Sequence, residues 1–185
     1  PKLEILALDD SSQDKTPEII KQFAHDGVRF ISSKKVPDKW LAKNYAYEQL
    51  ADEASGEVLV FMGVDVRIGQ DGIGQIVDRL RGSIAMVSLM PKRQGHWPVG
   101  AFVRPLRYLF ELALPDHLRR HPPVLSTCWA IKHDNFNKLG GMKALTHAII
   151  PEVHMAHKMQ QIGGYQFLLS SKSIGLITIK STKEQ

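Results

Sequence analysis

Short apolar runs alternate with helix-start signals along the first half of this 185-residue chain. Strands are predicted at Leu3 to Leu8, Val28 to Ser32, Val58 to Met62 and Ile84 to Leu89. Helices are predicted at Thr16 to His25, Ala42 to Glu53 and Ile73 to Leu80. This alternation is typical of an α/β fold with a mostly parallel central sheet and flanking helices. Such sheets bind ligands beyond the carboxyl ends of their strands.

The pattern changes after Pro91, where a Gly/Pro-rich loop leads into a basic amphipathic stretch. We interpret residues 92–123 as an excursion from the sheet, on the side of a membrane or an acceptor. Regular elements are then predicted at Leu125 to Ile131, Glu152 to Gln161, Tyr165 to Leu169 and Ile174 to Ile179. The chain contains no repeat, low-complexity tract or second domain, so residues 1–185 are predicted to form a single domain.

The composition, 43% hydrophobic and 23% charged, is that of an ordinary globular domain. The single cysteine, Cys128, excludes an intramolecular disulfide and favours a reducing compartment, with the cytoplasm as the default. It lies in an apolar run, so we interpret it as a buried side chain rather than a nucleophile. No apolar run is long enough to span a bilayer. The net charge of +5 suggests an anionic partner: a nucleotide diphosphate, an anionic lipid surface or a nucleic acid.

The sequence following the first predicted strand reads Asp9-Asp10-Ser11-Ser12-Gln13-Asp14-Lys15-Thr16, the pattern D-D-x-S-x-D-x-T. Short acceptor side chains at the end of a strand can grip a base or a ribose. They are equally suited to shaping a turn and capping the next helix. The loop alone therefore leaves both interpretations open.

Several further motifs follow in order, and together they carry a resemblance. They are Trp40-Leu41-Ala42-Lys43-Asn44, Ser55-Gly56-Glu57, Phe61-Met62-Gly63-Val64-Asp65, Phe136 to Met142 with Gly140-Gly141, and Pro151 to Ala156. This succession resembles the large inverting glycosyltransferase family that includes cellulose, chitin and hyaluronan synthases and many lipid glycosyltransferases. The W-x-x-K-N stretch most resembles members that act on polyprenoid or hopanoid-type lipids.

The resemblance implies a GT-A-type fold that binds a nucleotide diphosphate sugar, a metal-dependent activity and a lipid or saccharide acceptor. It implies that Asp10 contacts uracil or another base, and that Asp9, Ser12 and Lys43 lie near the nucleotide. Asp65 occupies the last acid of the family's D-x-D, which binds Mn²⁺ or Mg²⁺ bridging the diphosphate. Because the chain begins at Pro1 with a strand almost at once, we expect an excised piece whose family-type first strand lies upstream.

Two positions depart from the family pattern. Gly63 replaces the first acid of the D-x-D, which would weaken metal affinity or indicate a degenerate enzyme. Pro151-Glu152 replaces the usual acidic pair, so the resemblance makes Glu152 the candidate base in place of an aspartate. No Q-x-x-R-W motif follows it. A catalytically weak nucleotide-sugar-binding module is therefore the alternative to an active transferase.

Other side chains allow a functional and a structural interpretation. Trp97 and His154 are candidate acceptor contacts, and Trp40 and Trp97 could stack on a sugar or simply pack. His154 with His157, and His117 with His121, have metal-pair spacing without an H-E-x-x-H pattern. Phe102 to Leu112 is typical of a membrane-surface helix or of a core helix with solvated arginines, and the former would place the full-length protein at a cytoplasmic membrane face. No recognised motif supports nucleic-acid binding.

Overall fold

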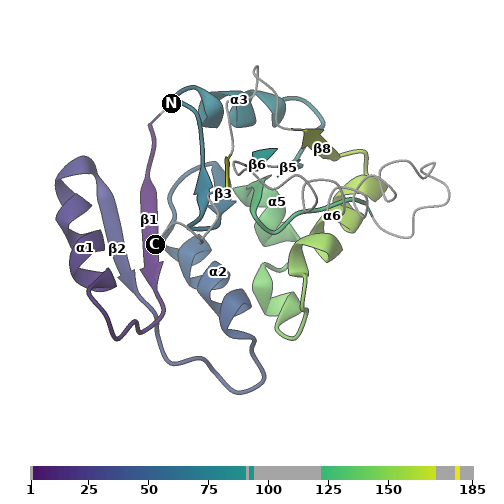
Figure 1. Cartoon of the computed structure of the whole chain (residues 1–185). Helices are drawn as coiled ribbons and strands as arrows, with labels where there is room; N and C mark the ends of the chain where they lie inside the picture. Colours follow the sequence, from purple (N-terminus) through teal and green to yellow (C-terminus); the bar gives the residue numbers. More distant parts are fainter. Residues whose placement is uncertain (1, 91, 94–121, 170–177, 180–185) are drawn as a thin grey trace, which may run out of the picture. The chain divides into compact units, whose positions relative to one another are not determined.

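The computed structural model describes residues 2–90, 92–93, 122–169 and 178–179 (Figure 1). The chain divides into two compact units. Unit 1 consists of Pro1–Leu59 and Lys132–Pro151, and unit 2 of Val60–Ile131 and Glu152–Gln185. The sequence-based expectation of one domain over residues 1–185 stays a prediction. In the part of the chain that is described, no helix is both long and apolar enough to cross a membrane.

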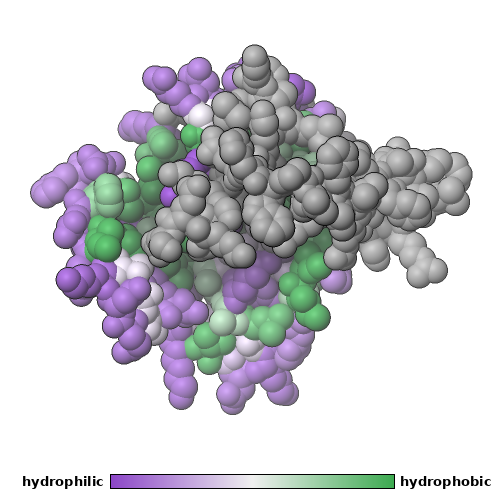
Figure 2. Space-filling view, viewed as in Figure 1, coloured by the Kyte–Doolittle hydropathy of each residue, from purple (hydrophilic) through white to green (hydrophobic). Residues whose placement is uncertain are grey.

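Unit 1 begins with two parallel strands, β1 (Ile5–Asp9) and β2 (Val28–Ser32), in register from Ile5 opposite Val28 to Asp9 opposite Ser32. The connection between them contains the helix α1 (Thr16–Gln22) and the 3₁₀ turn η1 (Phe23–Asp26). Gly27, with φ of 82°, ends this turn in a left-handed conformation that glycine adopts readily. The helix contacts both strands, which makes a β-loop-α-β unit. Hydrophilic and hydrophobic residues both show on its outward side (Figure 2), and Ile19 is 52% exposed.

The rest of unit 1 brings together two segments that lie far apart in the sequence. The long helix α2 (Ala42–Glu53) contacts β1 and the 3₁₀ turn η3 (Met142–Leu145), which follows the short helix α5 (His133–Lys138). The start of β3 (Val58–Met62) also belongs to this unit. The helix therefore links the N-terminal strand pair to a segment some hundred residues further along the chain.

Unit 2 is built on a four-stranded sheet in the order β3-β7-β5-β8. Its strands after β3 are β5 (Met86–Met90), β7 (Cys128–Lys132) and β8 (Tyr165–Leu169). β5 pairs parallel with β8 and antiparallel with β7. The first four residues of both β5 and β7 are buried, as expected for central strands covered on both faces.

Two helices and a smaller sheet complete the described part of unit 2. The helices are α3 (Gly72–Arg79) and α6 (Pro151–Gln161), the latter lying in unit 2 from Glu152 onward. The small sheet has the order β4-β9-β6, formed by β4 (Val66–Arg67), β6 (Lys92–Arg93) and β9 (Thr178–Ile179). β9 pairs antiparallel with β4 and parallel with β6.

The core of unit 2 lies on the central strands. Trp129 is fully buried and stacks on Phe61 with ring centroids 4.2 Å apart and an interplanar angle of 19°. Met86, Val87 and Leu89 of β5 are also fully buried. Burying aromatic and aliphatic side chains of this size contributes roughly 1.5–3 kcal/mol each. The stacked rings fix the end of β3, the strand that leads into the Gly63 to Asp65 turn.

The predicted fold class, an α/β structure with flanking helices, is confirmed. The bounds predicted for β2, α2, β3 and β8 agree with the structure. The first predicted helix is shorter than expected because its last turn tightens into η1 before Gly27. The strand predicted from Leu125 begins only at Cys128, since Ser126 and Thr127 form a turn.

Candidate functional site

The acidic loop of unit 1 begins where β1 ends, and Asp9 shapes it. Asp9 is buried, with 6% of its surface exposed, and its Oδ2 accepts the backbone N–H of Ser12 at 3.1 Å. Ser11, inside this short turn, has φ of 60°, a left-handed conformation that costs a non-glycine residue free energy. Asp14 accepts the N–H of Thr16 at 2.9 Å, and hydrogen bonds from Thr16 hold the pKa of Asp14 below its usual value. Asp9 and Asp14 thus make the local hydrogen bonds expected of turn residues, and the nucleotide-binding role of Asp9 stays a prediction.

Asp10 and Ser12 differ from Asp9 because both are exposed at the surface of the same loop. The buried aspartate orients the backbone, and the next residue presents its carboxylate to the outside. Asp9 itself keeps one oxygen, Oδ1, that has no hydrogen-bond partner among the described residues. A buried carboxylate oxygen of this kind is a strong acceptor for an N–H or O–H group. The loop therefore offers acceptors at its surface and just beneath it.

Lys43 lies in the first turn of α2, in the same unit as the acidic loop. Its side chain is exposed, and its ammonium lies 5.3 Å from the centroid of the Tyr47 ring one turn later. A cation held over an aromatic face in this way is partly ordered while staying accessible to an anion. The predicted position of Lys43 near the nucleotide stays a prediction.

Asn44, the next residue of the W-x-x-K-N stretch, is structural. It is fully buried, and its Nδ2 donates to the carbonyl oxygens of Leu145 at 2.7 Å and Ala148 at 2.9 Å. The N–H of Leu41 donates to Thr146 O at 2.9 Å beside it. The W-x-x-K-N motif contains Asn44 but does not indicate this role. Its partners are carbonyls about a hundred residues away, so no local pattern indicates them.

The Gly140-Gly141 pair has a packing role in unit 1. Gly141 has φ of 59°, and a Cβ added there would lie 2.7 Å from Oε2 of Glu48. The buried Glu48 accepts the N–H of Met142 at 2.7 Å and the Lys143 ammonium at 2.8 Å. The hydrogen bond to Glu48 raises the pKa of Lys143. Glycine is therefore required at position 141 by backbone conformation and by space alike.

In unit 2 the turn after β3 presents Asp65 to solvent between two anchored residues. Gly63 donates its N–H to Thr127 O at 3.0 Å, and its carbonyl accepts the N–H of the buried Val66 at 3.1 Å. A Cβ at Gly63 would lie 2.9 Å from Oδ1 of Asp65. The absence of a side chain at position 63 therefore leaves the space into which the Asp65 carboxylate folds.

The donor set of this turn limits how it could hold a metal ion. Within the described ranges, no group of three His, Cys, Asp or Glu side chains is placed to bind an ion. Mg²⁺ and similar hard cations are commonly held by one or two carboxylates together with substrate phosphate oxygens. A single exposed carboxylate fits that shared mode and does not form a complete protein site by itself.

Glu152 is the second residue of α6, and its side chain is fully buried. The hydroxyl of Ser126, in the turn before β7, donates a hydrogen bond to Oε1 of Glu152. Its place in the first helical turn agrees with the sequence prediction, and a negative charge is favoured at this end of a helix. No sequence pattern indicates this role of Ser126, because the serine lies inside a run that is predicted as a strand.

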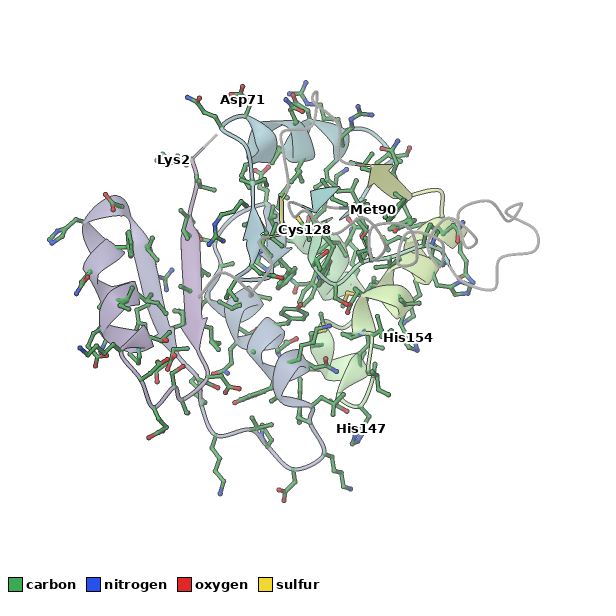
Figure 3. The ribbon with its side chains drawn as sticks, viewed as in Figure 1. Lys2, Asp71, Met90, Cys128, His147 and His154 are labelled. Carbon is green, nitrogen blue, oxygen red and sulfur yellow. The ribbon has the colours of Figure 1, made fainter. Side chains whose placement is uncertain are left out.

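The remaining candidates are scattered. His154 is exposed and projects outward from α6 (Figure 3). Trp97 lies outside the described residues, as do His117, His121 and all but the ends of the 92–123 segment. Cys128 is fully buried, and this burial raises the pKa of its thiol to about 12. A thiol with that pKa stays protonated near neutral pH, which excludes it as an activated nucleophile.

Comparison with solved structures shows the same fold at low sequence identity. A mannosyltransferase from Pyrobaculum calidifontis, solved with GDP-Man and Mn²⁺, is 18% identical with a TM-score of 0.68, covering 98% of this chain and 48% of its own. Glucosyl-3-phosphoglycerate synthase from Mycobacterium tuberculosis, solved with Mn²⁺, UDP-glucose and phosphoglyceric acid, is 18% identical with a TM-score of 0.52 and coverages of 95% and 60%. TarS from S. aureus, solved with UDP, is 14% identical with a TM-score of 0.57 and coverages of 96% and 51%.

This chain thus spans about half to three fifths of the length of these structures. No curated protein matches it. A family model described as glycosyl transferase family 2 matches residues 1–140, which is most of the chain and includes the acidic loop, Lys43 and the Asp65 turn. The chain therefore belongs to glycosyltransferase family 2.

Proposed function

We propose that this domain transfers a sugar from a UDP-linked donor to a lipid or saccharide acceptor, with inversion at the anomeric carbon. The observation that carries the proposal is the exposed Asp65 carboxylate at the end of β3, within a family 2 glycosyltransferase. Support for a UDP donor comes from relatives of the same fold that were solved with UDP-glucose or UDP, although another was solved with GDP-Man.

The donor roles fall to residues between Asp9 and Asp65. Asp10 accepts hydrogen bonds from the base, with Asp9 and Ser12 holding its loop in shape, and Lys43 neutralises phosphate charge. Asp65 would hold a divalent cation, Mn²⁺ or Mg²⁺, which when bound would supply Lewis-acid screening of the charge that develops on the leaving diphosphate.

The base in this proposal is Glu152. Its carboxylate takes the proton of the acceptor hydroxyl while that oxygen forms a bond to the anomeric carbon, and the diphosphate departs with the electron pair of the broken C–O bond. One displacement inverts the configuration. The hydrogen bond from Ser126 supports the assignment, because the carboxylate already accepts a hydrogen bond from an alcohol hydroxyl, the same group that the acceptor would present.

The acceptor side of the proposal involves residues 92–123, with Trp97 and His154 as candidate contacts. The basic amphipathic stretch Phe102 to Arg120 would bring the full-length protein to an anionic membrane surface at the cytoplasmic face, where a lipid acceptor resides. Charge reversal at Arg104 and Arg107 should release the protein from anionic vesicles at low salt. Wild-type protein that stays in the supernatant would remove the membrane part of the proposal without affecting sugar transfer.

A second candidate function is a nucleotide-sugar-binding module with little or no turnover. Gly63 favours it, since this turn lacks the second carboxylate that would strengthen ion binding. The two candidates are separated by titrating UDP-glucose with Mn²⁺ while measuring UDP release and glycoside formation with lipid and saccharide acceptors. Transfer that requires Asp65 and Glu152 supports the enzyme, whereas donor binding without product supports the module.

A further inference from the structure

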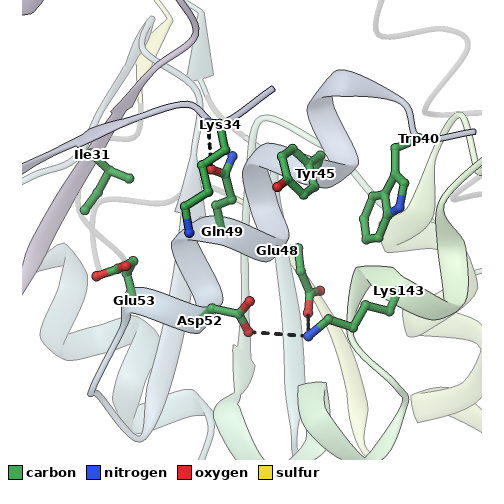
Figure 4. Close-up of a pocket in the computed structure, with 9 residues that line it drawn as sticks. All are labelled: Ile31, Lys34, Trp40, Tyr45, Glu48, Gln49, Asp52, Glu53 and Lys143. Carbon is green, nitrogen blue, oxygen red and sulfur yellow. Dashed lines mark hydrogen bonds and ion pairs between the residues drawn. The ribbon is translucent and has the colours of Figure 1, made fainter. Parts of the chain in front are cut away.

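A pocket of about 270 Å³ lies within unit 1 against the side of α2 (Figure 4). Its lining includes Trp40, Tyr45, Gln49 and Asp52, but neither Lys43 nor Asp10. The helical positions 45, 49 and 52 lie on one face of α2, and position 43 lies on another. The pocket is therefore separate from the residues that we assign to the donor.

Gln49 contains an unsatisfied donor at this pocket. The residue is 7% exposed, and its Oε1 accepts the backbone N–H of Lys34 at 2.9 Å. This contact fixes which end of the amide is the oxygen and leaves Nε2 as the other end. Among the described residues, Nε2 has no hydrogen-bond partner. A buried amide N–H without an acceptor is costly, so a ligand oxygen at this point would be stabilised.

The other lining groups decide what kind of ligand carries that oxygen. Three carboxylates line the pocket against two lysines, which disfavours an anion. Glu48 is engaged by Lys143 at 2.8 Å. Asp52 lies 3.6 Å from the same ammonium and Glu53 pairs with Arg29 at 2.8 Å, but their side chains are 64% and 45% exposed and can accept further hydrogen bonds. The Gln49 N–H and the two ammonium groups equally disfavour a cation. A neutral hydroxyl suits both the donors and the acceptors of the lining, because it donates a hydrogen bond to a carboxylate and accepts one from an amide.

Aromatic surface completes the pocket. Trp40 is half-buried and meets Tyr45 edge to face, with ring centroids 5.4 Å apart and an interplanar angle of 69°. Ring faces of this kind pack against the C–H surface of a pyranose, while the surrounding polar groups fix its orientation. The volume lies below the usual range of roughly 300–1,000 Å³ for drug-sized ligands, which suits one sugar unit better than a nucleotide.

We propose that this pocket binds a single neutral hexopyranose unit, with Gln49 Nε2 donating to a sugar oxygen, Asp52 accepting from a hydroxyl and Trp40 contacting the ring. The site goes beyond the proposed transfer reaction, because binding here needs neither donor nor metal ion. It would hold a sugar unit of a saccharide or glycolipid against unit 1.

The test uses the whole chain with methyl β-glucopyranoside and methyl α-mannopyranoside, followed by saturation-transfer NMR without nucleotide or metal. We expect saturable binding of at least one glycoside with a Kd of roughly 1–10 mM, as suits so small a ligand. Gln49→Leu, which removes the donor, should weaken binding at least about tenfold. Gln22→Leu makes the same change at an exposed position of α1 and should have no effect.

Asp52→Ala provides a second variant, because this exposed residue is replaced without opening the core. It should weaken glycoside binding as well, with an unchanged thermal transition. The proposal is overturned if neither glycoside binds at about 50 mM, if acyclic sorbitol binds as well as they do, or if both variants bind like the wild type. Loss of sugar transfer with intact glycoside binding would instead count against the proposed function alone.

Discussion

The Ser126 hydroxyl donates a hydrogen bond to Glu152, which joins the turn before β7 to the first turn of α6 within one unit. The bond gives a fully buried carboxylate a proton donor beside the positive end of a helix. Glu152 is therefore held in one orientation. A carboxylate fixed in this way is suited to receive a proton from an acceptor hydroxyl that binds in place of the Ser126 hydroxyl or beside it.

Glu152→Gln preserves the size of the side chain and removes its basicity. If Glu152 is the base, transfer should fall by roughly 10²-fold or more while donor binding is unchanged. Initial rates at saturating donor, together with calorimetric titration of UDP, separate the two effects. Ser126→Ala is the matched control, since it keeps the carboxylate and should lower the rate less. A Gln variant that transfers at the wild-type rate when chemistry limits turnover would leave Glu152 with a structural role only.

Asp65→Asn should abolish most Mn²⁺-dependent binding of UDP, because Asp65 is the carboxylate that the proposal assigns to the ion. Gly63→Asp tests the same idea in the opposite direction. The position has an ordinary backbone conformation, and the only close neighbour of a new Cβ is the flexible end of Asp65. We expect at least about tenfold tighter Mn²⁺-dependent UDP binding, or about 1.4 kcal/mol. Calorimetry that finds wild-type affinity in Asp65→Asn would rule out the metal role.

Asp10→Ala should weaken binding of UDP without removing the dependence on Mn²⁺, since the base and the ion are contacted by different residues. Asp14→Ala is the control in the same loop, because Asp14 is occupied by Thr16. Affinities for UDP, GDP and CDP measured side by side report on base recognition. Equal affinities of the wild type for all three would contradict a base contact by Asp10.

Asn44→Ala should destabilise the chain by about 1–3 kcal/mol, because carbonyls of the 145–148 segment lose a buried donor. Lys43→Ala, at the adjacent exposed position, should change the free energy of unfolding by no more than about 0.5 kcal/mol. Urea unfolding followed by circular dichroism measures both. Equal stabilities of the two variants would show that the Asn44 contacts contribute little.

Cys128 should resist alkylation by iodoacetamide at pH 8 and react at once in urea, because burial raises its pKa to about 12 in the folded state. A thiol pKa is about 8.5 in an unfolded chain. The unfolded thiol therefore ionises first, and the folded chain loses stability as pH rises above about 9. Cys128→Ala should reduce this loss. Mass spectrometry of the labelled protein follows the first effect, and unfolding at several pH values follows the second.

Local patterns predicted the elements whose ends are marked in the sequence. Thr16 and Pro17 mark the start of α1, and Gly56 and Glu57 mark the break between α2 and β3. The element ends predicted from these residues agree with the structure. The polar residues at the ends of β1 and β3 were likewise predicted as loops. Strand ends followed by acidic residues are local features, because an apolar run and the polar residues that close it occupy neighbouring positions.

Long-range contacts could not be predicted in this way. The antiparallel pairing of β7 with β5 depends on which strands meet, and alternation of apolar residues does not encode direction. Asn44 appeared in a motif with no partner visible in the sequence, and Ser126 read as part of a strand. The pocket beside Gln49 depends on residues from β2, α2 and η3 together, so its lining exists only in the folded chain.

The hydrogen bond from Asn44 to Leu145 spans 101 residues, and it also sets the order of events during synthesis. At about 5–20 residues per second, the ribosome needs roughly 5–20 s to deliver the partner segment after Asn44 has been made. During that interval the amide of Asn44 and the carboxylate of Glu48 lack their partners in the 142–148 segment, so this side of α2 is not yet covered. Chaperones that bind unfinished chains would therefore encounter only the N-terminal part of this unit. The unit is complete once the 142–148 segment has been synthesised and has packed against α2.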